Sequence, residues 1–192
     1  MIIWIASYPK SGNTWVRSFL TAYYFCENGI FDINKLNLIE DYPNKQFFKD
    51  TVKQGEIHKH WEFSQKNIYE KKEAKFLKTH NSLITAFGND FAVPKYTLGA
   101  IYIIRDPRNV ITSVKNHNDL ESYDEALEFM QDENKVLEDY PHLKNYAKTN
   151  IVNSWRINYQ SWIKSRSFPK QTIRYEDMIN KPLKTLKELI VF

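Results

Sequence analysis

Short apolar runs alternate with stretches of helical periodicity along this chain. Residues 1–7 are almost continuously apolar, which is typical of a strand in a parallel sheet that helices cover on both faces. A similar apolar run lies at 100–104, and shorter strand-like segments lie at 75–79 and 171–174; polar or turn-forming residues follow each of them. The pattern therefore predicts a strand at each of these positions, ending in a loop.

Apolar residues at helical spacing predict helices between and after these strands. We expect helices from 14 to about 28–29, from about 110, within the acidic stretch 119–139, across Ile151, Trp155, Tyr159 and Trp162, and from about 182. Residues 30–73 show little period, so loops and irregular helices are expected there. Alternating strands and helices predict an α/β fold of three layers with a mostly parallel central sheet. A chain of 192 residues can bury one core, which predicts a single domain over 1–192.

Composition limits the classes of ligand and the cellular compartment without identifying a reaction. The chain carries 27 basic and 23 acidic residues, a net charge of +4 that is spread along its length. This small excess suits an anionic small molecule as well as it suits a polynucleotide, so net charge decides little between them. There is no basic tail, and we expect no nucleic acid partner. Cys26 is the single cysteine and cannot form an internal disulfide, and the apolar start is too short to span a membrane. We therefore expect a cytoplasmic protein without a membrane span.

The most informative segment is 8–15, Tyr-Pro-Lys-Ser-Gly-Asn-Thr-Trp. A strand that runs into a short loop and a helix aims backbone N–H groups and the positive end of the helix dipole at one point, which suits a phosphate or a sulfate. Lys10 adds a full charge, Gly12 lets the backbone approach the anion, and further donors come from Ser11, Asn13 and Thr14. The segment lacks the glycine spacing and the Gly-Lys-Ser/Thr ending of the nucleotide P-loop, which disfavours an ordinary ATP or GTP site. A polar turn with a good helix cap is the simpler alternative.

Other strand ends also carry polar side chains. Arg105 ends the third strand, Ser113 follows eight positions later, Lys78 and His80 end the second strand, and Tyr175 follows the last one. A guanidinium is a rigid fork that matches phosphate, and imidazole titrates near neutral pH as a general base must. Taken singly, each of these side chains is more often solvated or packed. Ligands of parallel sheets bind beyond the carboxyl ends of the strands, so we expect these side chains to converge there.

Residues 8–15 resemble the 5′-phosphosulfate-binding loop of the sulfotransferases that use 3′-phosphoadenylyl sulfate (PAPS), with Asn13 where many members have threonine. The resemblance implies that Lys10 contacts the oxygen that bridges the sulfuryl group and the leaving phosphate, and that Trp15 flanks the adenine. Arg105 and Ser113 stand at the spacing of the family's pair that holds the 3′-phosphate.

Lys78-Thr79-His80 resembles the family segment that carries the catalytic histidine, and Tyr175 matches a tyrosine near the adenine. The resemblance implies transfer of a sulfuryl group to a hydroxyl or amine of a small-molecule or carbohydrate acceptor, with adenosine 3′,5′-bisphosphate (PAP) as the other product. His80 is then the base, assisted by Lys10 and Lys78, and no metal is expected. The alternatives are a P-loop-like nucleotide kinase and a non-catalytic remnant that binds PAP or PAPS. The sequence does not indicate the oligomeric state.

Two regions leave alternatives open. The segment 44–73 either lines an acceptor pocket or packs in the core, with aromatic rings from Phe47, Phe48, His58, His60, Trp61, Phe63 and Tyr69. Cytosolic members of the family usually continue to an Arg-Lys-Gly segment that closes over the 3′-phosphate, whereas this chain ends in an apolar stripe of Leu183, Leu186, Leu189 and Ile190. We expect a truncated coding sequence, or a partner or shortened fold that replaces the missing cover.

Overall fold

The central feature is a sheet of five parallel strands in the order β2-β3-β1-β6-β9. The structure is a computed structural model, and it describes residues 1–49, 51–138 and 146–192. The strands are β1 (Ile2–Ser7), β2 (Glu40–Asp41), β3 (Lys75–Thr79), β6 (Thr97–Ile104) and β9 (Lys170–Arg174). The predicted α/β class with a mostly parallel sheet is confirmed, and the four predicted strands are β1, β3, β6 and β9.

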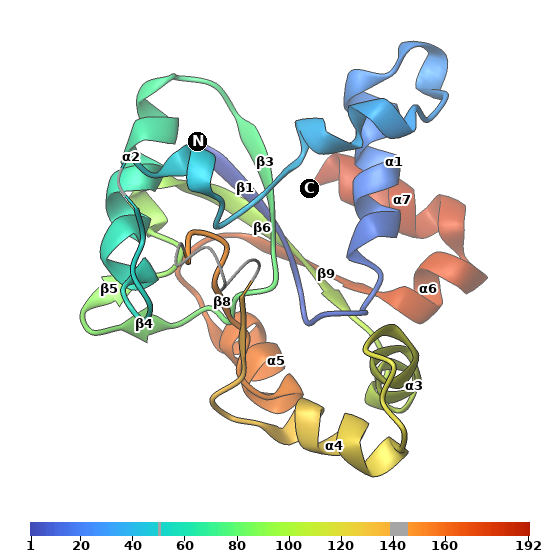
Figure 1. Cartoon of the computed structure of the whole chain (residues 1–192). Helices are drawn as coiled ribbons and strands as arrows, with labels where there is room; N and C mark the ends of the chain where they lie inside the picture. The colour runs from blue at the N-terminus through green and yellow to red at the C-terminus, as the bar shows by residue number, and fades with distance from the viewer. Residues whose placement is uncertain (50, 139–145) are drawn as a thin grey trace.

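Helices cover both faces of the sheet (Figure 1). One face carries α1 (Asn13–Phe25), α6 (Tyr175–Asn180) and α7 (Pro182–Val191), and the other carries α2 (Trp61–Glu70) and α5 (Trp155–Lys164). Side chains alternate along a strand, so Trp4 packs with Trp61 and Trp162 on the second face while Ile5 packs with Leu20 on the first. The central strand is therefore apolar on both faces, as its sequence requires.

Two more helices continue the chain beyond β6. These are α3 (Pro107–His117) and α4 (Tyr123–Gln131), and they pack together through Val110, Val114, Ala126 and Met130 around the ring of Tyr8. Asp106 caps α3 by accepting a hydrogen bond of 2.9 Å from the Arg108 amide, and Pro107 occupies the first turn. This cluster extends the core past the carboxyl end of β1.

Short elements complete the chain. They are the 3₁₀ helices η1 (Glu27–Gly29), η2 (Ile33–Leu38), η3 (Lys45–Phe47), η4 (Ile57–His60) and η5 (Pro94–Tyr96), the antiparallel pair β4 (Thr85–Ala86) and β5 (Asn89–Asp90), and the antiparallel pair β7 (Val136–Leu137) and β8 (Asn150–Ile151). The irregular region expected at 30–73 thus consists of 3₁₀ turns, the two-residue strand β2 and the regular helix α2.

Three helix predictions were too long. The first helix, α1, ends at Phe25 rather than near 28–29, because Cys26 adopts an extended conformation. Two later helices are also shorter than predicted. The acidic stretch 119–139 holds only α4, because Asp132 adopts an extended conformation and β7 follows; Asp139 lies outside the described residues. Ile151 belongs to β8 rather than to α5, which begins after Ser154, whose side chain accepts a hydrogen bond from the Ile157 amide. In both places a local cap or turn overrides the apolar spacing.

The apolar stripe predicted in the last helix is only partly right. Leu186 and Leu189 of α7 pack against the sheet, whereas the Leu183 side chain is 68% exposed. Thr185 takes the buried place in the first turn, and its hydroxyl donates to the Lys181 carbonyl at 3.0 Å. The buried face of α7 is therefore rotated away from Leu183.

Two leucines of α7 test this packing. Leu189→Ala, at a side chain that is 4% exposed, should lower the free energy of unfolding by about 2–5 kcal/mol because it opens a core cavity. Leu183→Ala, the matched control on the same helix, should change it by less than about 0.5 kcal/mol. Urea unfolding followed by circular dichroism measures both, and equal losses would contradict the packing of α7.

Candidate active site

A cavity of about 520 Å³ opens where β1, β3 and β6 end. It is lined by most of the side chains that the sequence singled out: Lys10, Gly12, Asn13, Thr14, Lys78, His80, Arg105, Ser113 and Tyr175. Its lining, within the described residues, does not include Ser11 or Trp15. Ser11 is buried below the loop, and the Trp15 side chain is 42% exposed on α1. The expected convergence at the strand ends is therefore present for the charged groups.

The loop after β1 depends on a glycine. Gly12 has a φ of 97°, and a Cβ placed there would lie 2.4 Å from Cδ2 of Tyr175. Only glycine combines this left-handed conformation with such a close ring contact. No side chain among the described residues caps α1, which starts at Asn13, so its first amide groups and its dipole remain available to an anion in the cavity.

Arg105 ties three segments together at this loop. Its Nη1 donates to the Lys10 carbonyl oxygen at 2.9 Å, and its guanidinium carbon lies 4.4 Å from the centre of the Tyr175 ring. Within the described part of the chain, its buried Nε has no hydrogen-bond partner. One edge of the guanidinium is thus fixed by protein, while the group still has donors for an anion. Ser113, two turns into α3, lies on the same cavity wall.

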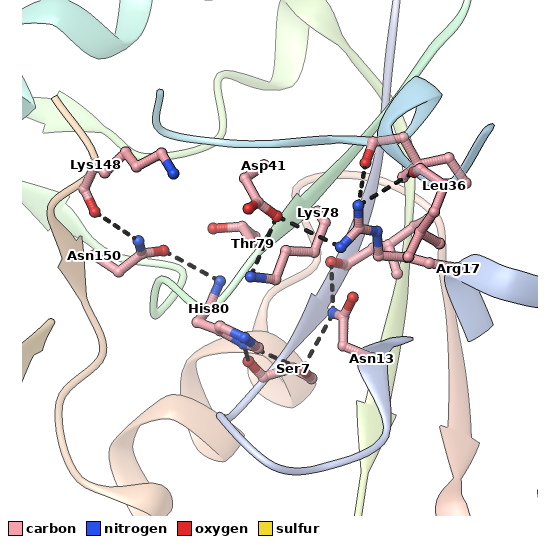
Figure 2. A network of polar contacts seen from close by, with 12 residues as sticks. Ser7, Asn13, Arg17, Leu36, Asp41, Lys78, Thr79, His80, Lys148 and Asn150 are labelled. Atoms are coloured by element: carbon pink, nitrogen blue, oxygen red, sulfur yellow. Dashed lines mark hydrogen bonds and ion pairs between the residues drawn. The ribbon is translucent and has the colours of Figure 1, made fainter. Parts of the chain in front are cut away.

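His80 is held by the end of β1 (Figure 2). Its Nδ1 lies 2.8 Å from the Ser7 carbonyl oxygen and 3.3 Å from the Ser7 hydroxyl. A carbonyl oxygen only accepts, so Nδ1 carries the proton and Nε2 is left with a lone pair. The backbone is fixed as well, because the His80 amide donates to Asn150 Oδ1 at 3.3 Å and Asn158 Nδ2 donates to the His80 carbonyl at 3.0 Å.

The surroundings keep this imidazole neutral. Burial, and then the positive charges of Lys78, Arg17 and Lys10, hold the pKa of His80 well below its usual value, while the hydrogen bond to Ser7 opposes the shift. At pH 7 the ring is therefore uncharged and Nε2 can accept a proton. Such a group in a charged cavity is suited to act as a general base.

Asn13 differs from the prediction that its side chain donates to the anion. Its Nδ2 donates to the Ile5 carbonyl oxygen at 3.1 Å and to Ser7 Oγ at 3.2 Å, back toward β1 (Figure 2). The same Ser7 hydroxyl lies beside Nδ1 of His80. The side chain of Asn13 thus connects the start of α1 to the strand end that holds His80.

Several residues of the cavity were missed or misplaced by sequence reasoning. Arg17, four residues after Asn13 and so on the same helix face, lines the cavity, and this spacing was a usable signal. The apolar lining comes from Val114, Phe129 and Leu137, and no described residue of 44–73 is part of it. In that segment Phe48, Trp61 and Ile57 pack in the core, which is the alternative that the aromatic pattern had left open.

Comparison with known proteins decides the family. The sulfotransferase domain matches residues 2–192. The chain belongs to the sulfotransferase family. Among curated proteins, none matches this sequence.

Two solved sulfotransferase-like structures share the fold. Mouse sulfotransferase SULT7A1 complexed with PAP is 17% identical with a TM-score of 0.55, and 98% of this chain covers 56% of that one. Retinol dehydratase in complex with androsterone and the inactive cofactor PAP is 14% identical with a TM-score of 0.54, and 98% of this chain covers 58% of it. This sulfotransferase chain thus spans little more than half the length of these relatives.

The described residues contain neither a membrane-spanning helix nor a metal-binding cluster. No helix within 1–49, 51–138 and 146–192 is long and apolar enough to cross a membrane. The same residues contain no group of three or more histidine, cysteine or carboxylate side chains placed to hold a metal ion.

The neutral state of His80 makes stability depend on pH. Because its folded-state pKa is below the unfolded value of about 6.5, the unfolded chain takes up the proton first as pH falls. Unfolding free energy should therefore be highest above about pH 7 and decline through about pH 6.5, more steeply in the natural protein than in His80→Gln. Urea unfolding from about pH 5 to pH 8 measures this difference, and parallel curves for the two proteins would contradict the neutral imidazole.

Proposed function

We propose that this sulfotransferase chain binds PAPS and transfers its sulfuryl group to a hydroxyl or amine, with His80 as the general base. One observation carries the proposal: three features line the same cavity. They are the loop before the uncapped start of α1, the arginine Arg105, whose guanidinium can bind a phosphate, and the neutral His80. The PAP found in both solved relatives supports this choice of donor.

The cavity offers two places for the anionic groups of such a donor. Lys10 and the first amides of α1 suit the 5′-phosphosulfate, while Arg105 and Ser113 suit the 3′-phosphate. The hydrogen bond from Arg105 to the Lys10 carbonyl fixes the two places relative to each other. Tyr175 and the exposed face of Trp15 are the aromatic surfaces that we assign to the adenine.

The reaction follows from these positions. The acceptor oxygen or nitrogen forms a bond to sulfur as the bond between sulfur and the 5′-phosphate oxygen breaks, and that oxygen keeps the electron pair. The acceptor proton goes to Nε2 of His80, which its bond to Ser7 leaves unprotonated. Lys10 and the α1 amides stabilise the charge that grows on the leaving phosphate. In this mechanism, most of the catalysis comes from the positioning of donor and acceptor and from hydrogen-bond donors that are already in place.

The acceptor side is less polar. Val114, Phe129 and Leu137 form an apolar wall, and His117 and Asn118 add polar atoms at its edge. This mixture suits a small molecule or a carbohydrate that carries a hydroxyl or amine beside an apolar surface. The single cysteine, Cys26, remains our reason to propose a cytoplasmic setting.

The donor site is tested by removing its charges. Lys10→Ala and Arg105→Ala should each weaken PAP binding by about tenfold or more, because each removes a charge-assisted contact of about 1.5–3 kcal/mol. Lys95→Ala, at the opposite end of β6, makes the same charge change and should leave the affinity within about twofold. Calorimetry with PAP measures all three variants. Unchanged PAP affinity in both site variants would contradict the assignment of the donor site. In a thermal-shift comparison, stabilisation of the natural chain by ATP with magnesium that equals its stabilisation by PAP would favour the kinase alternative.

The role of His80 is tested by turnover. His80→Ala should bind PAP nearly as well as the natural chain while transfer falls by about 10²–10⁴-fold, the range for loss of a general base. Transfer is followed with labelled PAPS and an acceptor found in a screen of phenols, alcohols, amines and sugars. An active His80→Ala protein would assign the proton to another group, and a natural chain that binds PAP but transfers to no acceptor would favour the non-catalytic remnant.

A further inference from the structure

The edge strand β2 places one carboxylate opposite a lysine of the cavity. β2 has only two residues, and its parallel register with β3 pairs Glu40 with Leu77 and Asp41 with Lys78. Asp41 Oδ1 lies 3.3 Å from Nζ of Lys78. The Tyr42 amide then donates to the Lys78 carbonyl at 2.7 Å and locks this register. The pairing of Asp41 with Lys78 is therefore set by backbone hydrogen bonds on both strands.

Arg17 fixes the segment that carries this carboxylate (Figure 2). From α1, its Nη2 donates to the Ile39 carbonyl at 2.6 Å and to the Leu36 carbonyl at 3.3 Å. Its Nη1 lies 3.6 Å from Asp41 Oδ1, the same oxygen that pairs with Lys78. The Arg17 side chain is 11% exposed, so little room is left for it to turn. A buried guanidinium thus holds both the backbone and the side chain of the β2 segment.

The restraint on Lys78 matters because other cationic side chains line the same cavity. Lys10, Arg17, Lys78 and Arg105 all line it. Like charges in one cavity repel, and without a fixed partner a long lysine side chain turns outward to water. Asp41 is a counter-ion to both Arg17 and Lys78, and it lies on the side of β3 away from β1 and the anion-binding loop. It therefore restrains Lys78 without competing for the loop.

We propose that Asp41, itself fixed by Arg17, is a positioning residue that orients the Lys78 ammonium group toward the sulfuryl group of the donor. This inference rests on the proposed function. Asp41 touches neither donor nor acceptor in this role; it acts through Lys78. A restrained ammonium group meets a sulfuryl oxygen at a lower entropic cost than a free one, so losing the restraint weakens that contact while the rest of the donor site stays intact.

The test compares two ligands that differ at one group. PAP and PAPS carry nearly the same total charge near pH 8, so removing one carboxylate changes the long-range attraction of both alike. The ratio of their dissociation constants isolates the contact to the sulfuryl group. Asp41→Asn should lower the preference for PAPS over PAP by about tenfold, as Lys78→Gln should, because each loses one charge-assisted contact. The double variant should lose no more than either single one.

Glu40→Gln is the matched control. It removes the same charge from the neighbouring residue of β2, where Glu40 pairs with Lys75 at 2.9 Å near the opposite end of β3. Glu40→Gln should prefer PAPS over PAP as strongly as the natural chain does. Asp41→Glu keeps the carboxylate, so it should keep most of the preference that Asp41→Asn loses. Calorimetry with both nucleotides measures the whole set.

Three results would overturn the inference while leaving the donor site intact. The first is an Asp41→Asn variant that prefers PAPS over PAP as strongly as the natural chain does. The second is a double variant in which the losses of the two single variants add. The third is a Glu40→Gln variant that loses as much of the preference for PAPS as Asp41→Asn does. If the natural chain binds neither PAP nor PAPS, the proposed function itself fails, and the inference fails with it. Unfolding curves for each variant show that a changed ratio comes from folded protein.

Discussion

The crowding of positive charge around one cavity is the constraint on which the rest of the site depends. Lys10, Arg17, Lys78 and Arg105 surround the same space, and such a set repels itself in a medium less polar than water. Three of the four are visibly restrained by protein: Arg105 by the Lys10 carbonyl and the Tyr175 ring, Arg17 by two carbonyls, and both Arg17 and Lys78 by Asp41. Because these side chains are already ordered, binding of an anion would cost less side-chain entropy.

Burial and the same charges together keep His80 neutral. An imidazolium would be a further cation among these, so burial and neighbouring charge together favour the neutral ring. The Ser7 carbonyl then selects which nitrogen keeps the proton. In the function that we propose, anion binding and proton acceptance are therefore two results of one electrostatic arrangement. A bound anion that partly neutralises the cations would also raise the basicity of Nε2.

Sequence reasoning found the parts of the fold in which burial dominates. The apolar runs of β1 and β6 have few other ways to bury both faces, so their positions could be predicted from the pattern alone. The strand β2 could not, because Glu40 and Asp41 are charged and pair through register at a sheet edge. The exposure of Leu183 was also missed, since helical spacing gives a face but not its rotation on the sheet.

The candidate site divides in the same way. Residues in local motifs, such as Lys10 and Gly12, could be identified because strand, loop and helix follow one another directly in the chain. The contacts of Gly12 with Tyr175 and of Arg17 with Asp41 join segments far apart in sequence, and no spacing rule brings these residues together. The inward turn of Asn13 depends on the Ser7 hydroxyl at the end of β1, and this contact is likewise visible only in three dimensions.

The two sides of the cavity are built from different elements. This difference affects which side could change in sequence to accept another acceptor in the proposed enzyme. The side that we assign to the donor consists of strand ends and helix starts that the sheet core fixes. The apolar side consists of Val114 and Phe129 on α3 and α4 and Leu137 on the two-residue strand β7, which pairs with β8 in a small sheet of its own. Substitutions of the partly buried Phe129 and Leu137 would change the surface offered to the proposed acceptor while leaving the sheet intact, whereas Val114 is buried in the core between α3 and α4. The side that we assign to the donor is therefore tied to the sheet, and only part of the side that we assign to the acceptor can vary at low cost to the fold.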